Sequence, residues 1–137
     1  MNLRLNSEFG TLKAVLMHRP GKEIDRLTPY NKELLLFEDV PYLEAMQKEH
    51  DFFTDLIKQT TGAQVYRLHE LLIQVLSNRE ILEKLMHDAL TKSGLTHFKE
   101  HILDRLSTAE CATALTAGVK VYELKRKIPN LSSGELL

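Results

Sequence analysis

The residue types best suited to chemistry lie in one short segment, where an apolar run leads directly into carboxylates. Residues 34–37 read Leu-Leu-Leu-Phe, and Glu38 and Asp39 follow them at once. Apolar walls that carry a few polar groups are typical of sites for small molecules. The segment therefore indicates one wall of an active site, placed just before a helix whose apolar stripe contains His50.

A purely structural role is the alternative for the same residues. Leu36 and Phe37 would then lie in the hydrophobic core. Glu38 and Asp39 would be solvated residues at the amino end of the next helix, where the helix dipole favours carboxylates. The sequence leaves both interpretations open.

His50 and Cys111 are further candidates, and a structural role is favoured for each. His50 falls on the apolar stripe of its helix, so a partly buried imidazole with one satisfied hydrogen bond is expected rather than a catalytic group. Cys111 lies among alanines on an apolar helix face. A raised pKa and an inert thiol are expected in such surroundings.

A metal site is a third possibility, on a helix that carries His97, His101 and Asp104. Their spacings of four and three residues place these side chains on one helical face. Charged neighbours such as Lys99 and Arg105 favour a solvated face instead. The chain also lacks paired cysteines, so we expect no zinc site of the usual spacing and no metal ligands.

The composition is that of an ordinary soluble protein. The 137 residues carry a formal net charge of -1, so nothing favours nucleic acid or an anionic membrane as a partner. No apolar stretch approaches the length of a membrane span, and the first residues lack the apolar run of a signal peptide. The only cysteine excludes an internal disulfide. We therefore expect a cytoplasmic protein.

The first half of the chain predicts an α/β unit that would position the candidate wall. Residues 12–18 form an almost continuously apolar run closed by Arg-Pro-Gly, the pattern of a buried strand. A short helix over residues 28–36 opens with Thr-Pro, and a longer one over residues 41–59 stops at Gly62. A second strand over residues 63–68 completes a βαβ-like unit, which favours parallel pairing of the two strands.

From residue 77 onward the pattern is entirely helical. Ser77 and Ser107 each begin a capping box, with a glutamate three residues later, and so predict two helix starts with a further helix between them. Gly118 ends the later of the two. Residues 120–127 are assigned to an exposed helix end, and residues 129–137 lack any period and are expected to fray.

Several ordered motifs give the chain a resemblance that covers nearly its whole length. They are Glu8-Phe9-Gly10, His18-Arg19-Pro20-Gly21, Thr28-Pro29, the apolar-to-acidic segment from Leu34 to Glu44, and Gly62 to Leu72. Together these motifs resemble the amino-terminal third of arginine deiminase. Residues 106–124 resemble the helical insertion of that family more loosely.

The resemblance implies a fold for the whole protein and a place for this chain within it. The intact fold would be a five-bladed α/β propeller of the guanidine-modifying, or pentein, type, with a helical bundle inserted in its first part. Residues 1–76 would supply the α/β unit of the propeller. Residues 77–137 would supply much of the helical insertion, left incomplete.

The resemblance also implies a reaction, the hydrolysis of L-arginine to citrulline and ammonia through a cysteine thiouronium intermediate. By matching the family segment, Leu36, Phe37 and Asp39 would line one side of the arginine pocket. The Phe-x-Arg-Asp-Pro-like motif, the His-x-Asp pair and the cysteine of the family's far end do not occur here, so no catalytic residue is assigned. No metal or organic cofactor is implied.

Because the catalytic motifs are absent, we expect this chain alone to be inactive. Arginine would be the partner of the intact enzyme, and a homo-oligomer is left open. The alternative is a non-catalytic remnant or regulatory module of the same fold that acts through protein contacts. A less favoured alternative is a helical metal-binding module centred on His97 and His101.

Overall fold

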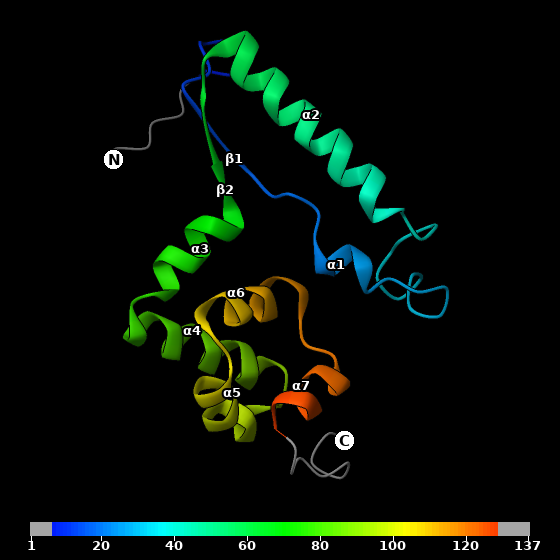
Figure 1. The fold of residues 1–137 in the computed structure, drawn as a ribbon, viewed down its shortest axis with the longest axis vertical. Coiled ribbons are helices and arrows are strands. Elements are labelled where there is room, and N and C mark those ends of the chain that lie inside the picture. Colours follow the sequence, from blue (N-terminus) through cyan, green and yellow to red (C-terminus); the bar gives the residue numbers. More distant parts are fainter. Residues whose placement is uncertain (1–6, 129–137) are drawn as a thin grey trace.

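The computed structural model describes residues 7–128, which form two parts, and the chain passes from the first part to the second through one helix. Strands β1 (Ala14–Met17) and β2 (Gln64–Arg67) lie with the long helix α2 (Leu43–Thr61) at one end of the molecule. Helices α4 to α7 gather at the other end, and α3 (Leu68–Leu76) connects them to the strands (Figure 1). The described residues thus have a mixed α/β architecture, as predicted.

The strand, helix and strand of the first part confirm the predicted βαβ-like unit. The two strands pair in parallel, with Ala14 opposite Gln64 and Met17 opposite Arg67. The first strand is shorter than the predicted range 12–18, because only four of its residues enter the ladder.

The expectation that the first strand is buried is wrong. The side chain of Leu16 is 56% exposed, and the other residues of β1 are only half-buried. The sheet of the described residues has two strands, so no neighbouring strand covers either outer edge. The first strand is therefore apolar in sequence but lacks the neighbouring elements that usually bury such a strand.

Helix α2 occurs close to where its periodicity predicted it. Gly62 adopts the left-handed conformation at its carboxyl end, with φ of 67°, and its N–H donates to the carbonyl of Lys58. Thr54 is fully buried, and its hydroxyl donates to the carbonyl of His50 over 2.7 Å. Phe53 was expected on the buried stripe, but 53% of it is exposed, so the prediction for this residue is wrong.

The predicted helix over residues 28–36 is absent, and a series of turns replaces it. The hydroxyl of Thr28 does accept from the N–H of Asn31, over 3.3 Å, but the following bonds mix three-, four- and five-residue spans. A continuous helix needs one repeated four-residue span. The only regular element nearby is the single turn α1 (Lys22–Asp25), which the sequence analysis did not predict.

The second part is helical, as expected, with two differences in detail. Its elements are α4 (Arg79–Lys92), the short 3-10 helix η1 (Thr96–Phe98), α5 (Lys99–Arg105), α6 (Thr108–Ala117) and α7 (Val121–Lys127). Asn78 caps α4, so the capping box predicted at Ser77 is wrong by one residue. The box of Ser107 and Glu110 on α6 is confirmed.

Helix α3 also differs, because the strand predicted over residues 63–68 ends earlier and a helix begins at Leu68. Its last residue, Leu76, is 1% exposed and belongs to the main hydrophobic core. The other buried members of that core are Leu82, Met86, Leu90, Phe98, Ile102, Leu103, Cys111, Ala112, Leu124 and Ile128. The core of the described residues therefore lies in the helical part rather than around the sheet. The predicted tail, residues 129–137, lies outside the described residues.

Candidate functional site

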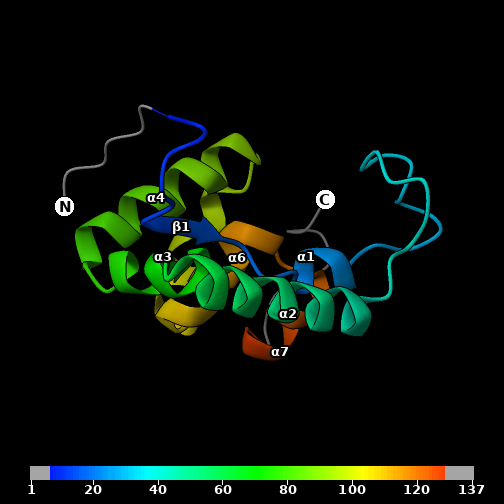
Figure 2. The ribbon, with the colours of Figure 1, turned by 90° about the horizontal axis from the view of Figure 1, so that it is seen from above.

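The three residues of the candidate wall lie on one loop, residues 26–42, between α1 and α2. Figure 2 shows this loop, in cyan, projecting to one side beyond both helices. The N–H of Phe37 donates to the carbonyl of Lys32 over 2.8 Å, and the ammonium of Lys32 reaches the carbonyl of Glu38. These bonds fold residues 32–38 back on themselves. We refer to residues 34–39, which include the apolar and acidic side chains, as the loop tip.

The structure does not bury the apolar residues 34–37 of this loop. Leu36 is 93% exposed and Phe37 is 37% exposed, so the alternative in which both belong to the core is wrong. Leu36 also has a positive φ of 61°, which none of the other non-glycine residues in 7–128 shares. The loop thus presents an apolar side chain outward on a backbone conformation that leucine rarely adopts.

Asp39 lies two residues after Phe37 in the chain, and its carboxylate is largely free. Its Oδ1 accepts a hydrogen bond from the N–H of Val40 over 2.8 Å, and the residue is exposed. No ion pair joins Asp39 to any other residue between 7 and 128. A cationic group arriving at the loop would therefore meet an unpaired carboxylate on the same short segment as exposed apolar side chains.

A cleft of about 620 Å³ opens at the carboxyl ends of the two strands, where open parallel sheets usually bind ligands. Arg19, just after β1, forms a two-point ion pair with Asp51 of α2, with contacts of 2.9 and 2.8 Å. Arg67, at the end of β2, lies 3.6 Å from the same carboxylate. The hydrogen bond from Arg19 is the main reason that the pKa of Asp51 lies below its ordinary value.

The sequence did not lead us to predict this charged group. A signal was available, because His18-Arg19 follows the first strand directly and Arg67 ends the second. Polar residues at the carboxyl ends of parallel strands meet at one edge of the sheet.

His50 borders this cluster and has the structural role expected for it. The residue is half-buried, and its Nδ1 lies 3.4 Å from the hydroxyl of Thr54. Burial and then the nearby positive charge of Arg67 lower its pKa. The neutral imidazole is therefore the form that the fold favours.

Cys111 is buried, with no exposed surface, in the centre of the helical core. Burial raises the pKa of its thiol, and the charge of Glu110 raises it further. A thiol that is both inaccessible and protonated is a poor nucleophile. The structure therefore agrees with the assignment of Cys111 to the core.

The single helical face predicted for His97, His101 and Asp104 is not formed, because His97 precedes the helix that carries the other two residues. No group of three or more His, Cys, Asp or Glu side chains within residues 7–128 is arranged to hold a metal ion. His97 lies in η1, before α5 begins, and its ring stacks against Phe98 at 4.1 Å between centroids. The helical periodicity that linked His97 to His101 is therefore broken.

Comparison with known proteins gives the context for these residues. The family model of arginine deiminase matches residues 33–133, well over half of the chain. The chain belongs to the arginine deiminase family. The match begins just before the exposed loop tip, so Leu36, Phe37 and Asp39 all lie within the segment shared with arginine deiminases.

Curated arginine deiminases show the same similarity along nearly the whole chain. The chain is 40% identical to the arginine deiminase of Oenococcus oeni over 129 residues, which cover 90% of this chain and 31% of that protein. Against the arginine deiminase of Lactococcus lactis subsp. lactis the identity is 38%, over 95% of this chain and 33% of the relative. The chain therefore spans about a third of the length of the arginine deiminases that it matches.

The arginine deiminase of Staphylococcus aureus gives the same result, with 36% identity over 94% of this chain and 32% of that protein. The matched segment includes α2 and the helices from α3 to α7 as well as the loop tip. No helix among the described residues is long and apolar enough to span a membrane.

Proposed function

We propose that this chain forms one wall of the arginine-binding pocket in an arginine deiminase. The observation that carries the proposal is residues 36–39 of the loop, where the exposed Leu36 and Phe37 are followed within two residues by Asp39, whose carboxylate forms no ion pair among the described residues. A guanidinium is permanently protonated and planar, and it is held by carboxylates. Apolar side chains suit the aliphatic stem of arginine.

The reaction of the intact protein would be hydrolysis of L-arginine to citrulline and ammonia. The attacking thiolate, which forms the thiouronium intermediate, would come from polypeptide outside this chain, because Cys111 is buried and protonated. This chain alone is therefore expected to be inactive, and no metal or organic cofactor is required of it. The buried free thiol suits a reducing compartment such as the cytoplasm.

The intact architecture that fits this role is a five-bladed α/β propeller of the pentein type. Residues 1–76 would form its α/β unit and residues 77–137 part of its helical insertion. The open edges of the two-stranded sheet support this arrangement, because further strands would pair there.

The decisive experiment uses the natural polypeptide that contains this sequence, purified from its own cells. Its mass and its formation of citrulline from arginine are measured first. Asp39→Asn and Phe37→Ala are then expected to raise the KM for arginine about tenfold or more, since each removes a pocket contact. Asp104→Asn, an exposed carboxylate on α5, is the matched control and should leave KM unchanged. Absence of citrulline, or Asp39→Asn behaving like the control, would contradict the proposal.

A second candidate function, a module that acts through protein contacts, is favoured by one separate observation. Helix α2 exposes Phe52 and Phe53, which are 71% and 53% accessible, on the same part of the molecule as Leu16. Exposed apolar surface rimmed by polar residues marks interaction sites. If the natural polypeptide ends near this chain, Phe52→Lys with Phe53→Lys should abolish its association with a partner, and Gln59→Lys on exposed α2 surface should not.

A further inference from the structure

The exposed loop has one strong anchor, at the residue where it begins. Arg26 directly follows α1, and its carbonyl accepts a hydrogen bond from the side-chain amide of Asn31 over 3.1 Å. Asn31 in turn accepts from the N–H of Thr28 over 2.7 Å. The next residue, Leu27, is 5% exposed. The backbone that leads towards the tip is thus tied to the backbone of Arg26.

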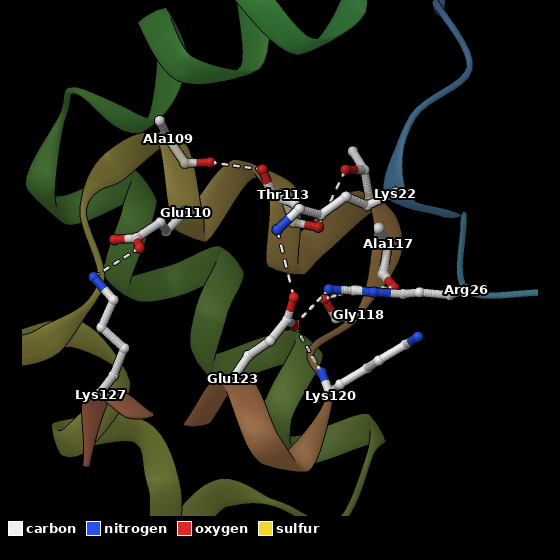
Figure 3. A network of polar contacts seen from close by, with 11 residues as sticks. Lys22, Arg26, Ala109, Glu110, Thr113, Ala117, Gly118, Lys120, Glu123 and Lys127 are labelled. Atoms are coloured by element: carbon white, nitrogen blue, oxygen red, sulfur yellow. Dashed lines mark hydrogen bonds and ion pairs between the residues drawn. The ribbon is translucent and has the colours of Figure 1, made fainter. Parts of the chain in front are cut away.

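The side chain of Arg26 extends in the opposite direction, into the helical part of the molecule. Its Nη1 donates to the carbonyls of Ala117 and Gly118 at the carboxyl end of α6. Its Nη2 donates to Oε2 of Glu123 on α7 over 2.6 Å. Figure 3 shows the guanidinium between these three acceptors, and only 12% of the side chain is exposed.

The partners of Arg26 are arranged for a guanidinium rather than for any cation. The last carbonyls of a helix lack partners within the helix, and the helix dipole makes this end attractive to positive charge. Glu123 is held in place because it also accepts from the N–H of Lys120 over 2.9 Å. A guanidinium has several donors in a fixed plane, whereas the single nitrogen of lysine cannot span the same set.

The contact joins segments that are far apart in the sequence. Arg26 and Ala117 are 91 residues apart, and the bonded groups come from opposite sides of the proposed boundary near residue 76. Lys22 of α1 also reaches Glu123, but over 3.4 Å and with 58% of its side chain exposed. Arg26 therefore carries most of the polar connection between the base of the loop and helices α6 and α7.

We propose that Arg26 is a positioning residue that fixes the substrate-binding loop against the helical part of the molecule. The proposal rests on the proposed function at one point, which is that Leu36, Phe37 and Asp39 of this loop bind arginine. Arg26 itself would not touch arginine. It would hold the loop base in one place, so that the loop tip presents its side chains in the geometry that binding requires.

The first test follows the loop in this chain without any substrate. Amide shifts and heteronuclear NOE values are measured by NMR for Arg26→Gln, with Lys22→Gln as the matched control from the same network. Arg26→Gln is expected to move the shifts and lower the NOE across residues 28–40, while the amides of Leu82 and Cys111 in the core stay unchanged. Lys22→Gln should leave both regions as they are. An unchanged loop in Arg26→Gln would overturn the proposal, and so would equal loosening of the core.

The second test uses the natural polypeptide and citrulline formation. Arg26→Gln is expected to raise the KM for arginine about fivefold or more with kcat within about twofold, the pattern of a lost binding geometry. Arg26→Lys should restore only part of this loss. A normal KM in an active Arg26→Gln protein would overturn the proposal. If the unchanged polypeptide forms no citrulline while Arg26→Gln still loosens the loop, the proposed function fails and the anchoring role of Arg26 stands.

Discussion

The two-point ion pair between Arg19 and Asp51 ties the end of β1 to the middle of α2. Two parallel N–H to oxygen contacts, of 2.9 and 2.8 Å, fix both the distance and the orientation of the two elements. Arg67 approaches the same carboxylate from β2. One carboxylate therefore connects all three elements of the βαβ unit.

Replacing Asp51 by asparagine should destabilise this unit. The amide cannot accept two charged bonds, and it leaves Arg19 and Arg67 facing each other without a counter-charge. We expect the midpoint of thermal unfolding to fall by a few degrees in a calorimetric scan. Asp55→Asn is the matched control, since Asp55 forms only an exposed 3.5 Å pair with Lys58, and it should leave the midpoint unchanged.

The capping box of α6 should make stability depend on acid pH. The ammonium of Lys127 and the N–H and hydroxyl of Ser107 lower the pKa of Glu110 from 4.5 to about 2. Because the pKa of Glu110 is lower in the folded state than in the unfolded state, Glu110 stabilises the fold above pH 4.5. This stabilisation is lost as the pH falls towards 2. Since Glu110 is partly exposed, solvent screening limits its contribution to about 1 kcal/mol.

Urea unfolding at a series of pH values measures this dependence. Glu110→Gln should lower the free energy of unfolding near pH 7 and flatten its decline at acid pH. Glu100→Gln, in the first turn of α5, is the matched control. A decline of the same steepness in Glu110→Gln would show that other groups are responsible.

The thiol of Cys111 should be unreactive in the folded chain, and a polar side chain at this position should destabilise the fold. Its side chain has no exposed surface, so modification by a thiol reagent should occur only at the rate at which the chain opens. Cys111→Ser should cost about 2 kcal/mol, because a hydroxyl needs a stronger hydrogen bond than the core offers.

Cys111→Ala is the matched control, with an expected cost of about 1 kcal/mol for the small cavity that it leaves. Denaturant unfolding of both variants gives the comparison. Fast modification of the native chain, or a serine variant as stable as the alanine variant, would contradict burial of this thiol.

A side chain at position 62 should destabilise the fold for a conformational reason alone. A Cβ at this position would meet no atom within 4 Å, but the backbone has φ of 67°. Gly62→Ala should therefore cost about 1 kcal/mol through the left-handed backbone. Gln59→Ala, three residues earlier on exposed helix surface, should cost far less in the same thermal scan.

The parts of the fold that the sequence predicted are those governed by local signals. The apolar period of α2 and the glycine at its end predicted that helix, and Ser107 with Glu110 predicted the start of α6. Parallel pairing followed from the order of the elements, since a helix long enough to return the chain lies between the strands.

The remainder depended on contacts between distant residues. Residues 34–37 are as apolar as a buried segment, yet all four are exposed in the structure, and no local pattern distinguishes them from a core segment. Arg26 gave no local signal, because its partners lie on α6 and α7. The start of α3 at Leu68 was missed for a different reason. The apolar residues around Leu68 fit the end of a strand as well as the start of a helix.

The long separation between the two strands has a consequence during synthesis. Ala14 pairs with Gln64, so β1 leaves the ribosome about fifty residues before its partner. At roughly 5–20 residues per second, β1 stays without its ladder for several seconds. The residues that α4 to α7 bring into contact are nearer to each other in the sequence. These contacts can therefore form sooner after the helices leave the ribosome. The apolar first strand is therefore open to aggregation for that time while the chain is being made.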